Sequence, residues 1–372
     1  MSLTKITGDV IKDSTIAAAD MSTTGTANSS TTLHGNSAWT AVSTTGVINI
    51  AAADPGTGQT AGNTWFLSGA INVVTPVSSG LGVWTTVDPI SEALVKVTSA
   101  GTRNAGIRMG GMTGWDEGTQ SGVTEEYNGA SWSTSGSLQT ARSSMTRAGT
   151  QSAALCAGGS NYGGSSGSYS MNNSEEYDGT SWASGNNLAT GTQDTEGDGT
   201  QSAAWCAGGY QNSNNATNTQ IYDGTSWANQ GGTLNTGRQY CNGCGTSSAG
   251  LIVAGRHDYT NTTEEWDGTS WSYGANVAFH LWKSGVFGTA TAAVSATGQS
   301  GGSSPAGKIA GTQEYDGTTW TNSSNVLLPR MTTGLGSQSV GLIIGGESAA
   351  SGNTGVNAVE EWNKGQFTWS LA

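Results

Sequence analysis

The apolar residues of this chain lie in short clusters that are separated by Gly, Ser, Thr and Asn. Val83–Val87 alternates in the manner of a strand, and Leu342–Ile344 is a short apolar run that ends in two glycines. The N-terminal apolar positions show no helical spacing. The longest apolar runs, such as 340–344, are far shorter than the ~20 residues that cross a bilayer. The pattern therefore predicts an all-β protein without a membrane-inserted segment.

One hairpin segment, an aromatic residue followed by Asp-Gly or Asn-Gly and then Trp, recurs along the chain. Tyr177-Asp178-Gly179-Thr180-Ser181-Trp182 is a typical copy, and it predicts a β-hairpin with a two-residue turn. The repeated Trp residues that pack these hairpins are Trp132, Trp182, Trp227, Trp271, Trp320 and Trp369. Their steps of 50, 45, 44, 49 and 49 residues match the ~40–50 residues of a propeller blade.

A short apolar strand that ends in glycine precedes each hairpin. The copies end at Gly111, Gly159, Gly209, Gly255, Gly298 and Gly346. Such strands are expected where backbones crowd together around a central axis. Each period holds about four strands, so we predict a β-propeller of six four-stranded blades in residues 98–372. Six blades are favoured because Trp369 gives the last repeat its own Trp strand, while a seventh blade or a closing strand from 31–97 is the alternative.

A strand ending in Gly-Gly, then Tyr and Trp, in periods near fifty residues, resembles the Kelch repeat of β-propellers. The Arg that follows the Trp strand in that family occurs in three periods, as Arg142, Arg238 and Arg330. The resemblance covers about 98–372. The aromatic-to-Trp spacing is five here (Tyr127 to Trp132) and a little longer in the family, and the glycine pair is single at Gly255 and Gly298. The resemblance implies a Kelch-like β-propeller.

The residues before the propeller contain no copy of the hairpin. Residues 6–20 resemble the N-terminal segment of many bacteriophage tail-fibre proteins, which have Ile-Thr-Gly-x-x-Ile-x-Asp-x-Thr-Ile-x-x-x-Asp. This resemblance implies that residues 1–30 attach the protein to a virus particle. Residues 31–97 are predicted to form a small β region or linker, with strands at 47–50, 64–67, 71–74 and 83–87.

Composition and charge exclude several classes of protein. Of the 372 residues, 58 are Gly, and 13 basic residues face 26 acidic ones, a net charge of −13. An acidic chain without a basic stripe argues against nucleic-acid binding. Cys241-x-x-Cys244 lacks the second ligand pair of a structural zinc site, and Cys156 and Cys206 occupy equivalent repeat positions that suit small apolar slots. We expect no metal and no cofactor.

Acidic pairs recur in the third strand of several repeats: Glu125-Glu126, Glu175-Glu176, Glu264-Glu265 and Glu360-Glu361. Paired carboxylates can serve glycoside hydrolysis, but a catalytic pair has no need to recur in every blade. We interpret these pairs as solvated strand edges that discourage pairing between sheets. The three histidines have no catalytic spacing, so no enzymatic activity is expected.

The long connections of the propeller are the expected place of function. They are rich in Tyr, Ser, Gly and Asn, which suit adaptable contact surfaces and the stacking of sugar rings. The predicted ligand-binding residues are Trp115, Tyr162, Tyr169, Tyr210, His257, Tyr259 and Trp282. The alternative is that these loops are polar only for solubility.

Together these observations predict a bacteriophage virion fibre, of the tail or the head, that is assembled in the host cytoplasm and exposed on the particle. Its expected partners are other virion proteins at the N-terminal segment and a host surface polysaccharide or receptor at the long loops. A homo-oligomer is expected, with a trimer as the form typical of fibres. A purely structural virion protein, such as a capsid decoration or tail adaptor, is the alternative, and a polysaccharide-degrading tailspike is the third interpretation.

Overall fold

The computed structural model describes residues 48–50, 64–67, 70–77, 82–115, 118–161, 170–256, 261–301, 307–352, 354–365 and 368–371. It contains two compact units, residues 1–81 with 365–372 and residues 82–364. Every regular element in the described ranges is a β-strand. In those ranges no helix is long and apolar enough to cross a membrane.

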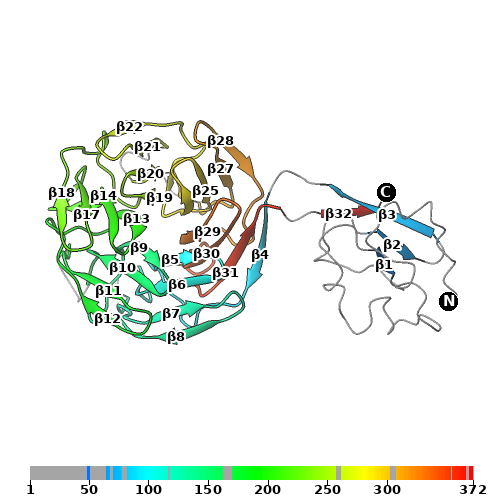
Figure 1. Ribbon diagram of the computed structural model, residues 1–372, viewed down its shortest axis with the longest axis horizontal. Coiled ribbons are helices and arrows are strands. Elements are labelled where there is room, and N and C mark those ends of the chain that lie inside the picture. Colours follow the sequence, from blue (N-terminus) through cyan, green and yellow to red (C-terminus); the bar gives the residue numbers. More distant parts are fainter. Residues whose placement is uncertain are drawn as a thin grey trace. The chain divides into compact units, whose positions relative to one another are not determined.

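Residues 82–364 form a β-propeller of six four-stranded antiparallel blades (Figure 1). The innermost strands β5, β9, β13, β19, β24 and β29 contact one another in a closed ring. From the axis outward, the first blade comprises β5 (Thr98–Thr102), β6 (Ala105–Met109), β7 (Thr124–Tyr127) and β8 (Trp132–Ser135). The second blade comprises β9 (Thr146–Thr150), β10 (Ala153–Ala157), β11 (Ser174–Tyr177) and β12 (Trp182–Ser184), and the third comprises β13 (Glu196–Thr200), β14 (Ala203–Ala207), β17 (Thr219–Tyr222) and β18 (Trp227–Asn229). The fourth blade comprises β19 (Asn242–Thr246), β20 (Ala249–Val253), β21 (Thr263–Trp266) and β22 (Trp271–Tyr273), and the fifth comprises β24 (Gly285–Thr289), β25 (Ala292–Ala296), β27 (Thr312–Tyr315) and β28 (Trp320–Ser323).

The sixth blade is closed by a strand from the start of the propeller. It comprises β29 (Arg330–Gly336), β30 (Val340–Ser348), β31 (Val359–Asn363) and, outermost, β4 (Val83–Val87). Trp84 takes the place opposite Trp362. The prediction that Trp369 supplies this outer strand is therefore wrong, and the closing-strand alternative is correct. Pairing the first strand with the last repeat closes the ring, so β31 has no free edge.

In the described residues of the unit formed by 1–81 and 365–372, the strands form one sheet, ordered β1-β2-β3-β32. Its strands are β1 (Ile48–Ile50), β2 (Thr64–Leu67), β3 (Ala70–Val77) and β32 (Thr368–Leu371), with β1 parallel to β2 and the other pairs antiparallel. The strand containing Trp369 thus pairs with β3. Strand pairing places the propeller at 82–364 where the repeats predicted 98–372. The predicted attachment segment 1–30 lies outside the described residues.

The hydrophobic core lies between adjacent blades. Ile107 and Met109 of the first blade pack with Cys156 and Tyr177 of the second in one buried cluster. Within each hairpin the aromatic residue packs on the Trp, as in Tyr177–Trp182 with ring centroids 5.0 Å apart. These large aromatic surfaces add to the apolar contact between neighbouring sheets. The repeated hairpin aromatics in the described part of the chain therefore pack in the core clusters or against them.

The hairpin turn differs in detail from the two-residue type that the sequence predicts. Tyr177 pairs with Trp182, so four residues form the loop, and of these only Gly179 has a positive φ, at 91°. The Asp178 carboxylate instead accepts hydrogen bonds from the backbone N–H groups of Thr180 (2.9 Å) and Ser181 (2.8 Å). These bonds lower the pKa of Asp178. The aspartate is thus the acceptor that shapes the turn.

The glycine pairs connect each blade to the next. The first position of the pair has a positive φ in all six blades, including Ala254 (52°) and Thr297 (54°), where glycine is absent. The second position is always glycine. Its N–H donates a hydrogen bond to a backbone carbonyl at or just before the start of the next blade, as from Gly159 to Thr192 (2.8 Å). The bond from Gly346 to the carbonyl of Leu94 (2.8 Å) joins the sixth blade to the segment before the first.

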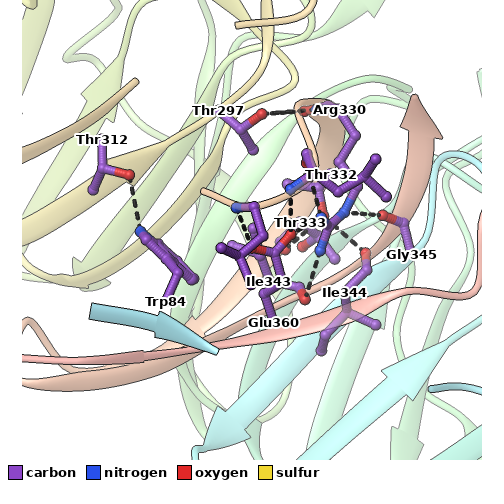
Figure 2. Close-up of polar contacts among 12 residues, drawn as sticks. Trp84, Thr297, Thr312, Arg330, Thr332, Thr333, Ile343, Ile344, Gly345 and Glu360 are labelled. Atoms are coloured by element: carbon purple, nitrogen blue, oxygen red, sulfur yellow. Dashed lines mark hydrogen bonds and ion pairs between the residues drawn. The ribbon is translucent and has the colours of Figure 1, made fainter. Parts of the chain in front are cut away.

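The acidic pairs are structural, and their first member is buried. In the second, fourth and sixth blades this carboxylate forms an ion pair with a buried arginine: Arg142–Glu175, Arg238–Glu264 and Arg330–Glu360. Figure 2 shows that Arg330 also donates to the carbonyl of Gly345 (2.9 Å). The interpretation of these glutamates as solvated strand edges is wrong for their first member, because the arginine supplies the charge that burial requires.

The arginine and the glutamate vary together from blade to blade. In the third blade Thr192 occupies the arginine position and Gln220 the glutamate position, and in the fifth blade Leu281 accompanies Gln313. The Gln220 side chain accepts a hydrogen bond from the backbone N–H of Thr190 (3.0 Å). The buried carboxylates accept hydrogen bonds in the same way from the segment that precedes the first strand of their blade. A neutral amide keeps this hydrogen bond without needing a buried cation.

The second glutamate of the pair binds the next blade. The Tyr177 hydroxyl donates to Glu126 (2.5 Å), and Tyr222 and Tyr315 donate in the same way to Glu176 and Glu265. Where the fourth blade has Trp266 in place of tyrosine, the third blade has Ile221 in place of glutamate. Glutamate and tyrosine thus occur together in these blades, whereas Glu314 of the fifth blade is followed by Trp362 in the sixth and forms an ion pair with Lys364 instead.

We predict that Arg238→Met lowers the free energy of unfolding by about 3–5 kcal/mol, because Glu264 would stay buried without its cation. The double variant Arg238→Met with Glu264→Gln should recover at least half of that loss, since it reproduces the neutral arrangement of Leu281 and Gln313. Denaturant titration followed by tryptophan fluorescence measures both. A double variant as unstable as the single one would contradict the charge-matching account.

Removing the closing strand should destabilise the ring. A chain of residues 82–364 is expected to unfold in one cooperative transition, whereas residues 98–364 leave the edge of β31 unpaired and lose the bond between Leu94 and Gly346. We expect a melting temperature lower by more than 10 °C and self-association of the shorter chain. Circular dichroism and size-exclusion chromatography provide the comparison, and equal melting temperatures would refute this role of β4.

Candidate functional site

The two faces of the propeller differ in their connections. Because the strands of each blade are antiparallel, the short turns after the first and third strands emerge on one face. The connections between second and third strands, and those between blades, emerge on the other, as the sequence predicts. This long-loop face contains the residues that surround the mouth of the axis.

A ring of six residues surrounds the axis at the start of the innermost strands, five just before their strand and Thr332 within β29, and we call it the axial ring. Its members are Lys96, Ser144, Asp194, Tyr240, Lys283 and Thr332. Each backbone N–H from Ser144 onward donates to the carbonyl of the preceding member, at 3.2, 3.1, 3.0, 2.9 and 2.9 Å. The first five have left-handed φ angles between 53° and 57°. For residues other than glycine this conformation costs about 1–2 kcal/mol each, and the inter-blade hydrogen bonds maintain it.

Arg147 closes the axis below this ring. Its guanidinium donates to Thr333 Oγ1 (2.8 Å) and to the carbonyls of Gly243 and Val286 (3.1 Å each), and it lies 3.2 Å from the carboxylate of Glu196. These partners belong to the sixth, fourth, fifth and third blades, while Arg147 belongs to the second. The side chain therefore spans the axis, and the mouth leads to a blind pocket.

The blind pocket, here called the axial pocket, is small and lined by polar groups. Its volume is about 30 Å³, room for about two water-sized groups. Three side chains that line it have an N or O atom without a hydrogen-bond partner: Ser144 Oγ, Glu196 Oε1 and Asn242 Nδ2. Their residues are only 5%, 7% and 6% exposed. Burial raises the pKa of Glu196 to about 7, against the opposing charge of Arg147.

Three aromatic rings meet at the mouth and form what we call the aromatic cluster. Trp115, on the long loop of the first blade, lies 5.9 Å from both Tyr240 and Trp282, which are 5.4 Å apart between centroids. Backbone bridges from Met112 to Val95 and from Gly114 to Thr354 hold the Trp115 loop. Trp115 therefore reaches across the axis to residues that precede the fourth and fifth blades.

A cation accompanies each ring of the aromatic cluster. The Lys96 ammonium lies 4.4 Å from the Trp115 centroid, that of Lys283 lies 5.0 Å from Tyr240, and the Arg256 guanidinium lies 5.8 Å from Trp282. These distances are within the range of cation–π attraction. The arrangement presents both apolar ring surface and positive charge at one place.

The structure brings together two of the predicted ligand-binding residues, Trp115 and Trp282. Tyr210 begins β15 (Tyr210–Gln211), which pairs with β16 (Asn214–Asn215), and its N–H donates to Gln193 beside the axial ring (2.7 Å). The predicted residues Tyr162, Tyr169, His257 and Tyr259 lie outside the described residues.

Sequence reasoning missed Tyr240 and the two lysines of the axial ring. Tyr240, Lys283 and Lys96 each lie two residues before an innermost strand. An alignment of the repeats at that position would have shown a different residue in every blade except for the repeated lysine. A position whose residue varies from repeat to repeat, inside a repeat that is otherwise constant, is the sequence signal that could have identified these residues.

No protein-family model matches the chain, and no curated protein sequence matches it. Among solved structures, the one titled "Structure of YjhT" is similar, with a TM-score of 0.60 and 14% sequence identity. The match covers 73% of this chain and 95% of that one. At this identity the likeness shows the fold alone, and it agrees with the β-propeller.

The raised pKa of Glu196 predicts a specific pH dependence of stability. The unfolded chain loses this proton near its ordinary pKa of 4.5 and the folded chain near 7. Stability should therefore fall as the pH rises from 4.5 to 7, by up to about 3 kcal/mol from this group. Glu196→Gln should remove that part of the slope, as urea unfolding between pH 4.5 and 8 would show. An unchanged slope in the variant would contradict it.

Proposed function

We propose that the protein is a host-recognition component of a bacteriophage virion, a tail or head fibre whose Kelch-like propeller binds surface polysaccharide at the mouth of the axis. The observation that carries the binding proposal is the aromatic cluster of Trp115, Tyr240 and Trp282. The virion assignment rests on the resemblance of residues 6–20 to tail-fibre proteins. Attachment to other virion proteins and a homo-oligomeric, trimeric fibre belong to the same proposal.

Saccharides fit the chemistry of this mouth. Aromatic faces bind the C–H faces of sugar rings, and nearby amides and charged groups bind their hydroxyls. The cluster lies on the long-loop face, where the third and fifth blades also present polar connections. Because Arg147 closes the axis, a ligand meets the propeller from this face only, as suits a module that binds a cell surface.

A polysaccharide-degrading tailspike is a second candidate, favoured by Glu196. A buried carboxyl whose pKa is about 7 is suited to donate a proton at neutral pH. Glycoside hydrolysis also requires a second carboxylate at a defined distance. We favour binding because the nearby carboxylates of Asp194 and Glu347 form ion pairs with Lys283 (3.2 Å) and Lys308 (2.6 Å).

A glycan array of bacterial surface polysaccharides tests the proposal. The full-length protein should bind at least one polysaccharide, and Trp282→Ala or Trp115→Ala should weaken that binding at least tenfold. Tyr273→Ala is the matched control, because Tyr273 is an exposed aromatic residue (58%) on the outer strand β22. Binding that survives both Trp changes, or no binding at all, would refute the proposed site. Release of reducing ends from a bound polysaccharide would favour the tailspike.

A further inference from the structure

We infer that the axial pocket binds a carboxylate, so that the saccharide recognised by this propeller is an acidic one, such as a uronic acid residue. The inference deepens the proposed function and rests on it. The carboxylate would enter the pocket, while the pyranose ring to which it is attached would lie against the aromatic cluster at the mouth. Trp115 belongs to both, since it lines the pocket and packs with Tyr240 and Trp282.

Two of the three groups that lack a hydrogen-bond partner in the pocket, beside Glu196 Oε1, can donate a hydrogen bond. The Ser144 hydroxyl and the Asn242 amide nitrogen have none, although both residues are more than nine-tenths buried. Leaving such groups unpaired is costly, so a ligand atom that accepts from them is favoured. Lys96, Lys283 and Arg147 line the same pocket. A group that accepts several hydrogen bonds and bears negative charge fits this set.

The distribution of charge supports an anion. The chain has a net charge of −13 and only 13 basic residues. Five of them gather at this mouth: Lys96, Arg147, Arg256, Lys283 and Lys308. The carboxylates among them each form an ion pair, Glu196 with Arg147, Asp194 with Lys283 and Glu347 with Lys308, although Glu196 Oε1 and Asp194 Oδ1 accept no hydrogen bond.

The size of the pocket is compatible with a carboxylate. A volume of about 30 Å³ accepts about two water-sized groups, which corresponds to the two oxygens of a carboxylate. A sugar ring is too large to enter, so it must remain at the level of Trp115 and Trp282. The anionic group and the ring of an acidic sugar are separated by one bond, in keeping with the adjacency of pocket and cluster.

Isothermal titration of the full-length protein with trigalacturonate, its methyl ester and sodium acetate tests this inference. Trigalacturonate should bind, and the ester should bind at least tenfold more weakly. Added salt should weaken the binding of trigalacturonate only. Ser144→Ala should reduce binding of the acid severalfold. Its melting temperature should not fall, because the hydroxyl has no partner in the unliganded protein. A purely structural role for Ser144 would lower the melting temperature instead.

Lys96→Met provides a second variant, expected to weaken trigalacturonate binding about tenfold. Lys364→Met is its matched control, because Lys364 follows β31 and pairs with Glu314 on the short-turn face. Equal affinity for acid and ester, or equal effects of the two lysine changes, would overturn the carboxylate inference. Failure of trigalacturonate and acetate to bind would also overturn it. Binding of neutral polysaccharides on the array that depends on Trp282 would leave the proposed function standing.

Discussion

The guanidinium of Arg147 is the contact on which the arrangement of blades depends. It joins the second blade to the third through Glu196 and to the fourth and fifth through two carbonyls. Through Thr333 it reaches the sixth blade, and Thr333 in turn contacts Ser99 of the first (3.1 Å). Burying this charge is favourable only because every partner is in place. The same side chain blocks the axis, so the polar pocket above it opens to one face.

Charge matching also explains how the repeats differ. A buried glutamate occurs where its blade offers an arginine, and a glutamine occurs where the blade offers Leu281 or Thr192. The first blade has no arginine at this position, where Leu94 stands, yet Glu125 is paired, because Arg108 of the neighbouring strand approaches it. These substitutions keep the hydrogen bonds of the repeat constant, so the backbone framework is nearly the same in each blade.

Much of the fold could be predicted from the sequence, because a repeat of Tyr, Asp-Gly and Trp encodes a hairpin locally. The closure of the ring could not be predicted from the sequence, because Trp84 and Trp369 are each followed by a small polar residue. Only the three-dimensional pairing of β4 with β31 distinguishes the two tryptophans. The burial of the glutamates could not be predicted for a related reason. Their burial depends on an arginine over twenty residues away in the chain, although Arg142, Arg238 and Arg330 were visible as a partial repeat. Trp115 and Trp282 could be singled out because they interrupt the repeat.

The axial ring shows why function is expected at the mouth of the axis. Its backbone is largely repeated from blade to blade, because five of the six members share the left-handed φ and five donate the same inter-blade hydrogen bond, yet its side chains are Lys, Ser, Asp, Tyr, Lys and Thr. Packing alone would favour the same residue at each position, as it does at the second glycine of each pair. Strained backbone at non-glycine residues persists only where the surrounding structure enforces it. A rigid ring that presents six positions of unequal chemistry is suited to bind an asymmetric ligand in one orientation.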